Sequence, residues 1–161
     1  MLLGFKRRFE PMVKDGSKTH TIRARRRDGR VPKIGEVLHC YTDVRQSSEE
    51  LLGRWPCTKV EPITIMIPFY VAGVPPSMAI RIADAALTEE EIALFAWRDG
   101  FRSAPRSPIM LKPGDPRAAQ EMARFWRLTH GRGITSCDFR GYVYHWDYAQ
   151  PMPAPGRRRK A

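Results

Sequence analysis

Stretches with the pattern of β-strands outnumber those with the pattern of helices, and this imbalance restricts the folds open to the chain. Strands are predicted at residues 2–5, 19–23, 34–41, 51–66, 78–83 and 139–146. One helical turn is predicted at residues 9–16. A longer helix begins at the capping box of Thr88 and Glu91, and another begins at Pro116 and ends at Gly131. Such elements predict an α+β domain, either a small β-barrel or a curled sheet, with helices on its outside.

The length of 161 residues suits one domain. We expect residues 1–148 to form it and residues 149–161, which are rich in proline and then basic, to be a disordered tail. The longest apolar stretch, residues 63–74, is interrupted by polar, proline and glycine residues and is too short to cross a bilayer. The first residues lack the pattern of a signal peptide. A cytoplasmic protein without membrane contact is therefore expected.

Positive charge is concentrated at the two ends of the chain. Of the net charge of +11, residues 1–33 carry +8, from eleven basic and three acidic residues, and residues 157–160 add four basic side chains. Clustered positive charge favours a polyanionic partner such as RNA, with binding that weakens in salt; general solubility is the alternative. The three cysteines are far apart and form no metal-binding spacing, so neither a metal nor another cofactor is expected.

Functional groups are densest in residues 17–23, directly after Gly16. In a regular strand Thr21 and Arg23 share one face, and Lys18 lies on the other. Lys18 reaches Thr21 only if the strand begins after Lys18 or contains a bulge, and Gly16 makes a bend easy. Arg23 can grip a phosphate or base edge, and a hydroxyl beside a buried lysine suits nucleophilic catalysis. The competing interpretation is a solvated edge strand whose charges prevent aggregation.

Four further residues are candidates for function. Asp99 precedes a glycine at a predicted helix end, where a negative charge is unfavourable; this indicates either a functional or a solvated carboxylate. His20 can titrate near neutral pH, or can be structural. Arg25 and Arg26 would contact phosphates if RNA binds, and would otherwise belong to a solvated loop.

The segment resembles the ASCH domain, whose signature Gly-x-Lys-x-x-Thr-x-Arg reads here Gly16, Lys18, Thr21 and Arg23. Further matching elements lie at residues 9–13, 32–38, 96–101, 125–126 and 141–146, so the resemblance covers about residues 2–147. It implies a PUA-like fold, a small mixed β-barrel with flanking helices.

Members of this family are implicated in RNA binding, and some small bacterial members resemble amidohydrolases that remove the acetyl group from N4-acetylcytidine. By motif position, Thr21 would be the nucleophile, Lys18 its base and Asp99 the acidic partner, where those members use glutamate. A segment at about residues 63–86 makes this chain longer than they are.

We therefore expect RNA or a modified nucleoside to bind in a cationic cleft. The ligand-binding residues would be Arg23, His20, Arg25 and Arg26. The first alternative is the amidohydrolase with Lys18, Thr21 and Asp99 as catalytic residues. A second is a ribonuclease that uses Lys18 or His20 in acid–base roles.

Overall fold

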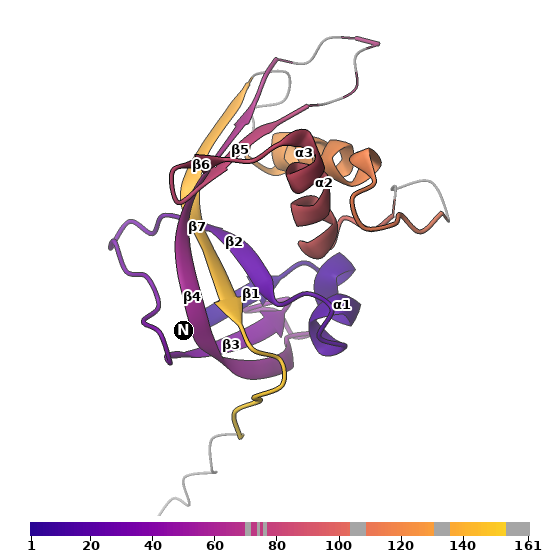
Figure 1. Cartoon of the computed structure of the whole chain (residues 1–161). Coiled ribbons are helices and arrows are strands. Elements are labelled where there is room, and N and C mark those ends of the chain that lie inside the picture. The colour runs from indigo at the N-terminus through magenta and orange to yellow at the C-terminus, as the bar shows by residue number, and fades with distance from the viewer. Residues whose placement is uncertain (70–71, 74, 76, 104–108, 131–135, 154–161) are drawn as a thin grey trace, which may run out of the picture.

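The structure is a computed structural model that describes residues 1–69, 72–73, 75, 77–103, 109–130 and 136–153. Over these residues it contains a seven-stranded sheet, three α-helices and one short 3-10 helix (Figure 1). The strands are β1 (Leu2–Phe5), β2 (His20–Ala24), β3 (Val37–Thr42), β4 (Glu50–Ile67), β5 (Ala79–Ile82), β6 (Ala85–Ala86) and β7 (Cys137–Trp146). The helices are η1 (Arg7–Phe9), α1 (Glu10–Lys14), α2 (Glu89–Arg98) and α3 (Pro116–His130).

The α+β class and every predicted strand and helix are confirmed, with ends that shift by a few residues. The short strand β6 was not predicted. It pairs with β5 across a tight turn at Ala83 and Asp84, whose backbone angles φ are both positive. The residue expected to end α3, Gly131, and residues 154–161 of the expected tail lie outside the described residues.

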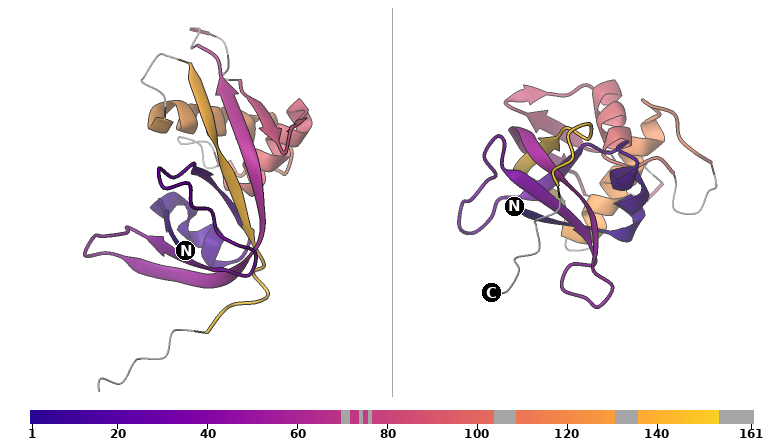
Figure 2. Two further views of the ribbon diagram at one scale, coloured as in Figure 1. Left: turned by 90° about the vertical axis from the view of Figure 1, so that its left-hand side faces the viewer. Right: turned by 90° about the horizontal axis from the view of Figure 1, so that it is seen from below.

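Strand β4 organises the sheet because it pairs with three others along its 18 residues. Its first part is antiparallel to β3, and its second part is antiparallel to β7 and to β5. Strand β1 adds to β3 in parallel, and β2 adds to β7 in antiparallel orientation. Figure 2 shows β4 and β7 side by side along the length of the molecule.

The sheet curls, but it does not close into the barrel that was expected. Strands β1 and β2 are its two free edges on the curled side, and no strand pairing joins them in the described chain. The Arg23 side chain bridges these edges instead. Its Nη2 donates to the Gly4 carbonyl oxygen at 2.7 Å, and its guanidinium lies 4.9 Å from the centre of the Phe5 ring. Because no pairing closes the sheet, the barrel prediction was wrong and the curled sheet was right.

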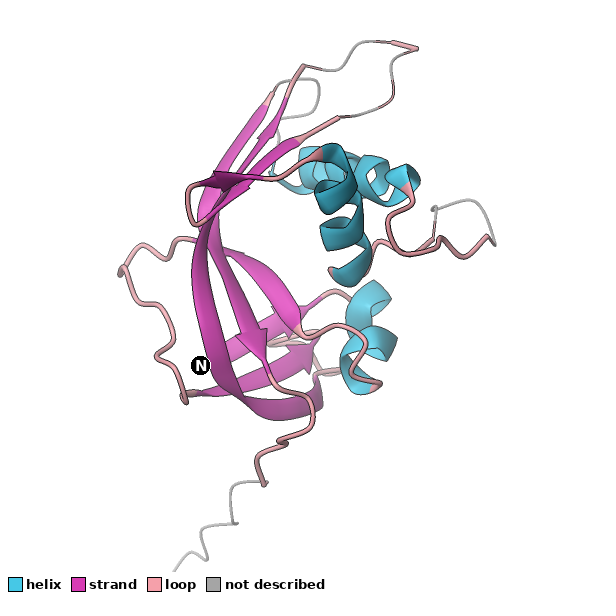
Figure 3. Ribbon diagram, viewed as in Figure 1, coloured by secondary structure: helices cyan, strands magenta, loops and turns pink. Residues whose placement is uncertain are grey.

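Helices α2 and α3 pack against each other and cover one side of the sheet (Figure 3). The predicted capping box starts α2: the Thr88 hydroxyl accepts from the Glu91 amide at 3.2 Å, and the Glu91 carboxylate accepts from the Thr88 amide at 2.8 Å. The buried Trp126 of α3 packs edge-on against Phe139 of β7, with ring centres 4.4 Å apart. None of the helices in the described ranges is long and apolar enough to cross a membrane.

Candidate functional site

A cavity of about 560 Å³ opens where the sheet fails to close. Strands β1 and β2 form one part of its wall, and the C-terminal half of α3 forms another. Lys18, Thr21, Arg23 and Asp99 all line it, although Asp99 is 81 residues distant from Lys18 in the sequence. The other lining residues include four aromatic side chains: Phe5, Phe9, Phe125 and Trp126.

Lys18 reaches the cavity because β2 begins only at His20. Gly16 has a φ of +76°, which turns the chain after α1, and the Lys18 amide then donates to the Met12 carbonyl oxygen at 2.9 Å. Freed from the alternation of the strand, the Lys18 side chain turns inward and is only 2% exposed. The strand therefore begins after Lys18, which is one of the two conditions predicted for bringing Lys18 to the same side as Thr21.

The ammonium of Lys18 is held by two oxygens of Asp99. It donates to the Asp99 carbonyl oxygen at 2.6 Å and to the carboxylate. Burial lowers the pKa of Lys18 and raises the pKa of Asp99, because desolvation penalises both charges by more than their attraction returns. The two pKa values are thereby brought closer together. Transfer of the proton from the ammonium to the carboxylate then costs less than it does in water.

Asp99 ends α2, where the helix dipole disfavours a negative charge. The Lys18 ammonium compensates for this charge. The misfit seen in the sequence therefore marks a carboxylate that is buried beside a cation rather than a solvated one.

Thr21 and Arg23 share a face of β2, as predicted, and both line the cavity. Among the described residues, no group hydrogen-bonds to the Thr21 hydroxyl. Two buried donors of lining residues also lack a partner in that part of the chain: Nε of Arg23 and Nε1 of Trp126. Buried polar atoms are rarely unsatisfied. Burial lowers the pKa of Arg23, as expected for a cation out of water.

His20 is not among the residues that line the cavity. It lies on the other face of β2, stacked on Phe95 at 5.1 Å between ring centres and 5.6 Å from His145. Its Nε2 lies 3.5 Å from Oδ1 of Asp99. Burial and then the charge of Lys18 hold the pKa of His20 well below its ordinary value, so the ring is neutral. His20 thus packs behind Asp99 rather than beside a ligand in the cavity.

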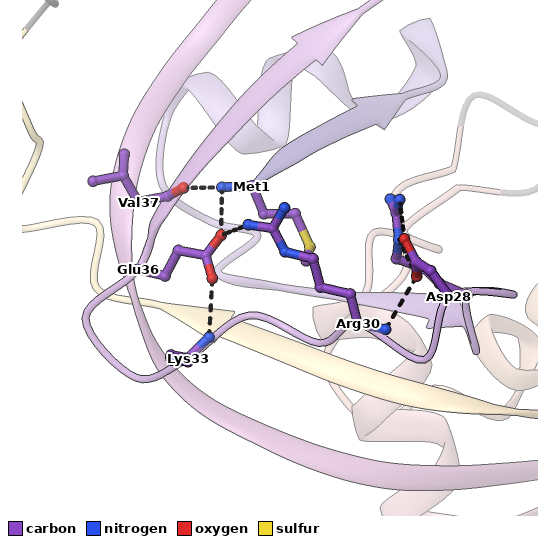
Figure 4. A network of polar contacts seen from close by, with 7 residues as sticks. Met1, Asp28, Arg30, Lys33, Glu36 and Val37 are labelled. Atoms are coloured by element: carbon purple, nitrogen blue, oxygen red, sulfur yellow. Dashed lines mark hydrogen bonds and ion pairs between the residues drawn. The ribbon is translucent and has the colours of Figure 1, made fainter.

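The basic loop after β2 is partly neutralised by its own acidic residues. Arg26 forms a two-point ion pair with Asp28, with nitrogen–oxygen distances of 2.9 and 3.0 Å. Figure 4 shows Glu36 accepting from the Arg30 side chain at 2.8 Å and from the Lys33 amide at 3.1 Å. Arg26 is exposed and lies outside the cavity, and Arg25 lines a different hollow. Of the four predicted ligand-binding residues, the cavity therefore gathers Arg23 alone.

Sequence reasoning missed the wall contributed by α3. Phe125, Trp126, Thr129 and His130 line the cavity, and His130 stacks on Trp126 with ring centres 4.2 Å apart. The two aromatic residues belong to a matching element of the ASCH resemblance, at residues 125–126. A helical pattern, however, does not reveal which part of a sheet a helix face will meet.

Comparisons with known proteins found no matching family model, no matching curated protein and no matching solved structure. Within the described part of the chain, no group of three or more His, Cys, Asp or Glu residues could hold a metal ion. The chemistry of the cavity is therefore read from its own side chains.

Proposed function

We propose that the cavity binds a ligand that contains a nucleobase, either RNA or a modified nucleoside. One observation carries the proposal: Lys18, Thr21 and Arg23 meet around a single cavity that aromatic side chains also line. A volume of about 560 Å³ lies in the range of ligand pockets, which is roughly 300–1,000 Å³. The resemblance to the ASCH domain supports the same class of ligand.

The side chains around the cavity suit the parts of a nucleotide. Aromatic rings such as Phe125 can stack on a base, and the partly exposed guanidinium of Arg23 can donate to its oxygen and ring-nitrogen acceptors. The exposed Lys6 also lines the cavity and lies 4.8 Å from the centre of the Phe125 ring, where its ammonium can meet a phosphate.

Calorimetric titration with cytidine, N4-acetylcytidine and a short single-stranded RNA at low salt tests the proposal. Arg23→Lys keeps the charge but removes the planar fork, and we expect affinity to fall on the order of tenfold. Arg117→Gln, on the exposed surface of α3 and outside the cavity, is the matched control and should bind as the wild type does. Thr21→Ala should retain binding. If none of these ligands binds the wild type at low salt, the proposal is lost.

An amidohydrolase is the second candidate, favoured by the buried pair of Lys18 and Asp99, which lines the same cavity as Thr21. The closer pKa values of the pair make a neutral amine on Lys18 accessible as a base. His20 lies off the cavity, so the arrangement favours this reaction over a ribonuclease that would use His20.

In this reaction the Thr21 oxygen attacks the acetyl carbonyl carbon while its proton passes to the Lys18 amine. The bond from that carbon to the exocyclic nitrogen breaks, and the nitrogen takes the proton from Lys18. Water then hydrolyses the acetyl ester on Thr21, which releases acetate and restores the hydroxyl.

Release of acetate from N4-acetylcytidine separates the two candidates. The enzyme requires that Lys18→Ala and Thr21→Ala both abolish turnover and that Thr21→Ser retains part of it. Circular dichroism should confirm that the variants are folded. Binding without turnover in the wild type would leave the first candidate alone, and turnover that persists in both alanine variants would remove the assignment of these residues.

A further inference from the structure

A second hollow, which we call the arginine groove, lies on the sheet near the turn between β5 and β6. Its volume is about 330 Å³. Three arginines and one tyrosine line it, namely Arg25, Arg81, Arg140 and Tyr142. The remaining lining residues are Pro62, Ile63, Thr64, Asp84 and Gly141. Four of its nine lining residues belong to the segment at residues 63–86, and the others come from β4 and β7 or follow directly after β2.

Strand register brings two of the arginines together. Thr64 of β4 pairs with Arg140 of β7 on one side and with Arg81 of β5 on the other. Directly paired residues point to the same face of a sheet, so the two guanidiniums rise from one row across three strands. Arg81 is steadied by a hydrogen bond from its Nη2 to the Asp84 carbonyl oxygen at 2.6 Å.

The charge of this groove is compensated only in part. Over the described ranges Arg25, Arg81 and Arg140 form no ion pair, and Asp84 is the one acidic residue that lines the groove. Some exposed arginines elsewhere are paired with carboxylates, as in Arg26 with Asp28 and Arg117 with Asp115. Three guanidiniums around one hollow repel one another and attract an anion that can accept several hydrogen bonds, which is the chemistry of phosphate.

The groove adjoins the cavity through one pair of residues. Tyr142 lines the groove and pairs directly with Arg23, which lines the cavity. Arg25, which follows two residues after Arg23, lines the groove as well. The half-buried Tyr142 ring lies nearly parallel to that of Tyr144, at 6.4 Å between centres, and can offer an aromatic surface to a base.

We propose that the arginine groove holds the phosphodiester backbone of a single-stranded RNA, one nucleotide of which enters the cavity. This inference rests on the proposed function and deepens it: the ligand is a strand rather than a free nucleoside. A positive groove beside aromatic rings is the usual arrangement for single-stranded nucleic acid. A duplex would have to unpair and unstack a base before that base could enter the cavity, which a single strand does not.

The test compares Arg81→Gln/Arg140→Gln with Arg98→Gln/Arg117→Gln, a control that removes two charges from exposed positions on α2 and α3. Fluorescence anisotropy would follow a labelled single-stranded RNA at several salt concentrations between about 50 and 200 mM. Loss of two phosphate contacts should lower the slope of log affinity against log salt by about 1.4, since each single-strand contact contributes about 0.7. In the control variant, the slope should decrease by less than half as much as it does in Arg81→Gln/Arg140→Gln.

Binding of the free nucleoside separates this inference from the proposed function. If the groove variant binds the nucleoside as the wild type does but has lost RNA affinity, the groove is supported. If its RNA affinity and salt slope match those of the control, the groove inference is overturned while the cavity proposal stands. Failure of the wild type to bind RNA and nucleoside alike would overturn both. An equal loss of affinity for poly-glutamate and for RNA would show general attraction of polyanions and would also overturn the groove inference.

Discussion

The ammonium of Lys18 and the carboxylate of Asp99 form a buried ion pair that joins the turn before β2 to the end of α2. The side chains of Lys18 and Asp99 are 2% and 8% exposed, so water does little to screen either charge. Removing one partner leaves the other buried alone, which costs about 3–5 kcal/mol in comparable pairs.

We therefore expect Asp99→Ala to lower the free energy of unfolding by about 3–5 kcal/mol, and Lys18→Met to lower it by a similar amount. The double variant leaves no lone charge and should be more stable than the sum of the two effects predicts. Urea unfolding of the four proteins measures this coupling. Additive losses would contradict a direct interaction between the two side chains.

Local sequence patterns predicted the structural features that depend on residues close together in the chain. The capping box at Thr88 and the bend at Gly16 were readable because the groups that make them are a few residues apart. Alternation along β2 also put His20 and Thr21 on opposite faces, and His20 was a candidate because an imidazole can titrate near neutral pH. Strand edges and helix faces meet through distant contacts, so neither the open gap between β1 and β2 nor the α3 wall could be read from periodicity.

Acid should weaken the fold through His20. Its pKa lies well below the ordinary value of 6.5 in the folded protein and returns to that value on unfolding. Below pH 6.5 the unfolded chain therefore binds a proton that the folded chain does not. The contribution of the neutral His20 to the free energy of unfolding is complete above pH 6.5. It falls by about 1.4 kcal/mol per pH unit below pH 6.5, until the pH reaches the pKa of His20 in the folded protein.

His20→Phe keeps a ring on Phe95 and removes the titration. The difference in unfolding free energy between this variant and the wild type should thus grow in favour of the variant as pH falls below 6.5. Urea unfolding over a pH series measures it. Parallel stability curves for the two proteins would show that His20 is not the group responsible.

The thiol of Cys40 should be unreactive while the protein is folded. Cys40 is fully buried, and burial raises its pKa to about 12, so almost no thiolate is present near neutral pH. In Cys57→Ser/Cys137→Ser, which leaves Cys40 as the one thiol, a disulfide reagent at about pH 8 should label the protein only after guanidinium is added. Rapid labelling of the native variant would contradict this burial.

Gly16 and Gly29 offer a matched test of the turn that delivers Lys18 to the cavity. Both have a positive φ, +76° and +67°, so alanine at either position carries the left-handed penalty of about 1–2 kcal/mol. A Cβ at Gly29 meets nothing within 4 Å, whereas a Cβ at Gly16 would lie 2.4 Å from the ring of Tyr148. Tyr148 packs on Trp55 and donates to the Lys14 carbonyl oxygen, so it cannot move without losing these contacts.

Gly29→Ala should therefore lower the free energy of unfolding by about 1–2 kcal/mol and leave ligand binding unchanged. Gly16→Ala should cost at least about 1 kcal/mol more, because the ring of Tyr148 must be displaced as well. It should also weaken binding in the cavity, since the same turn sets the position of Lys18. Urea unfolding and calorimetric titration of the two variants measure both effects. Equal stability and equal binding in the pair would mean that the turn at Gly16 does not depend on Tyr148 and does not position Lys18.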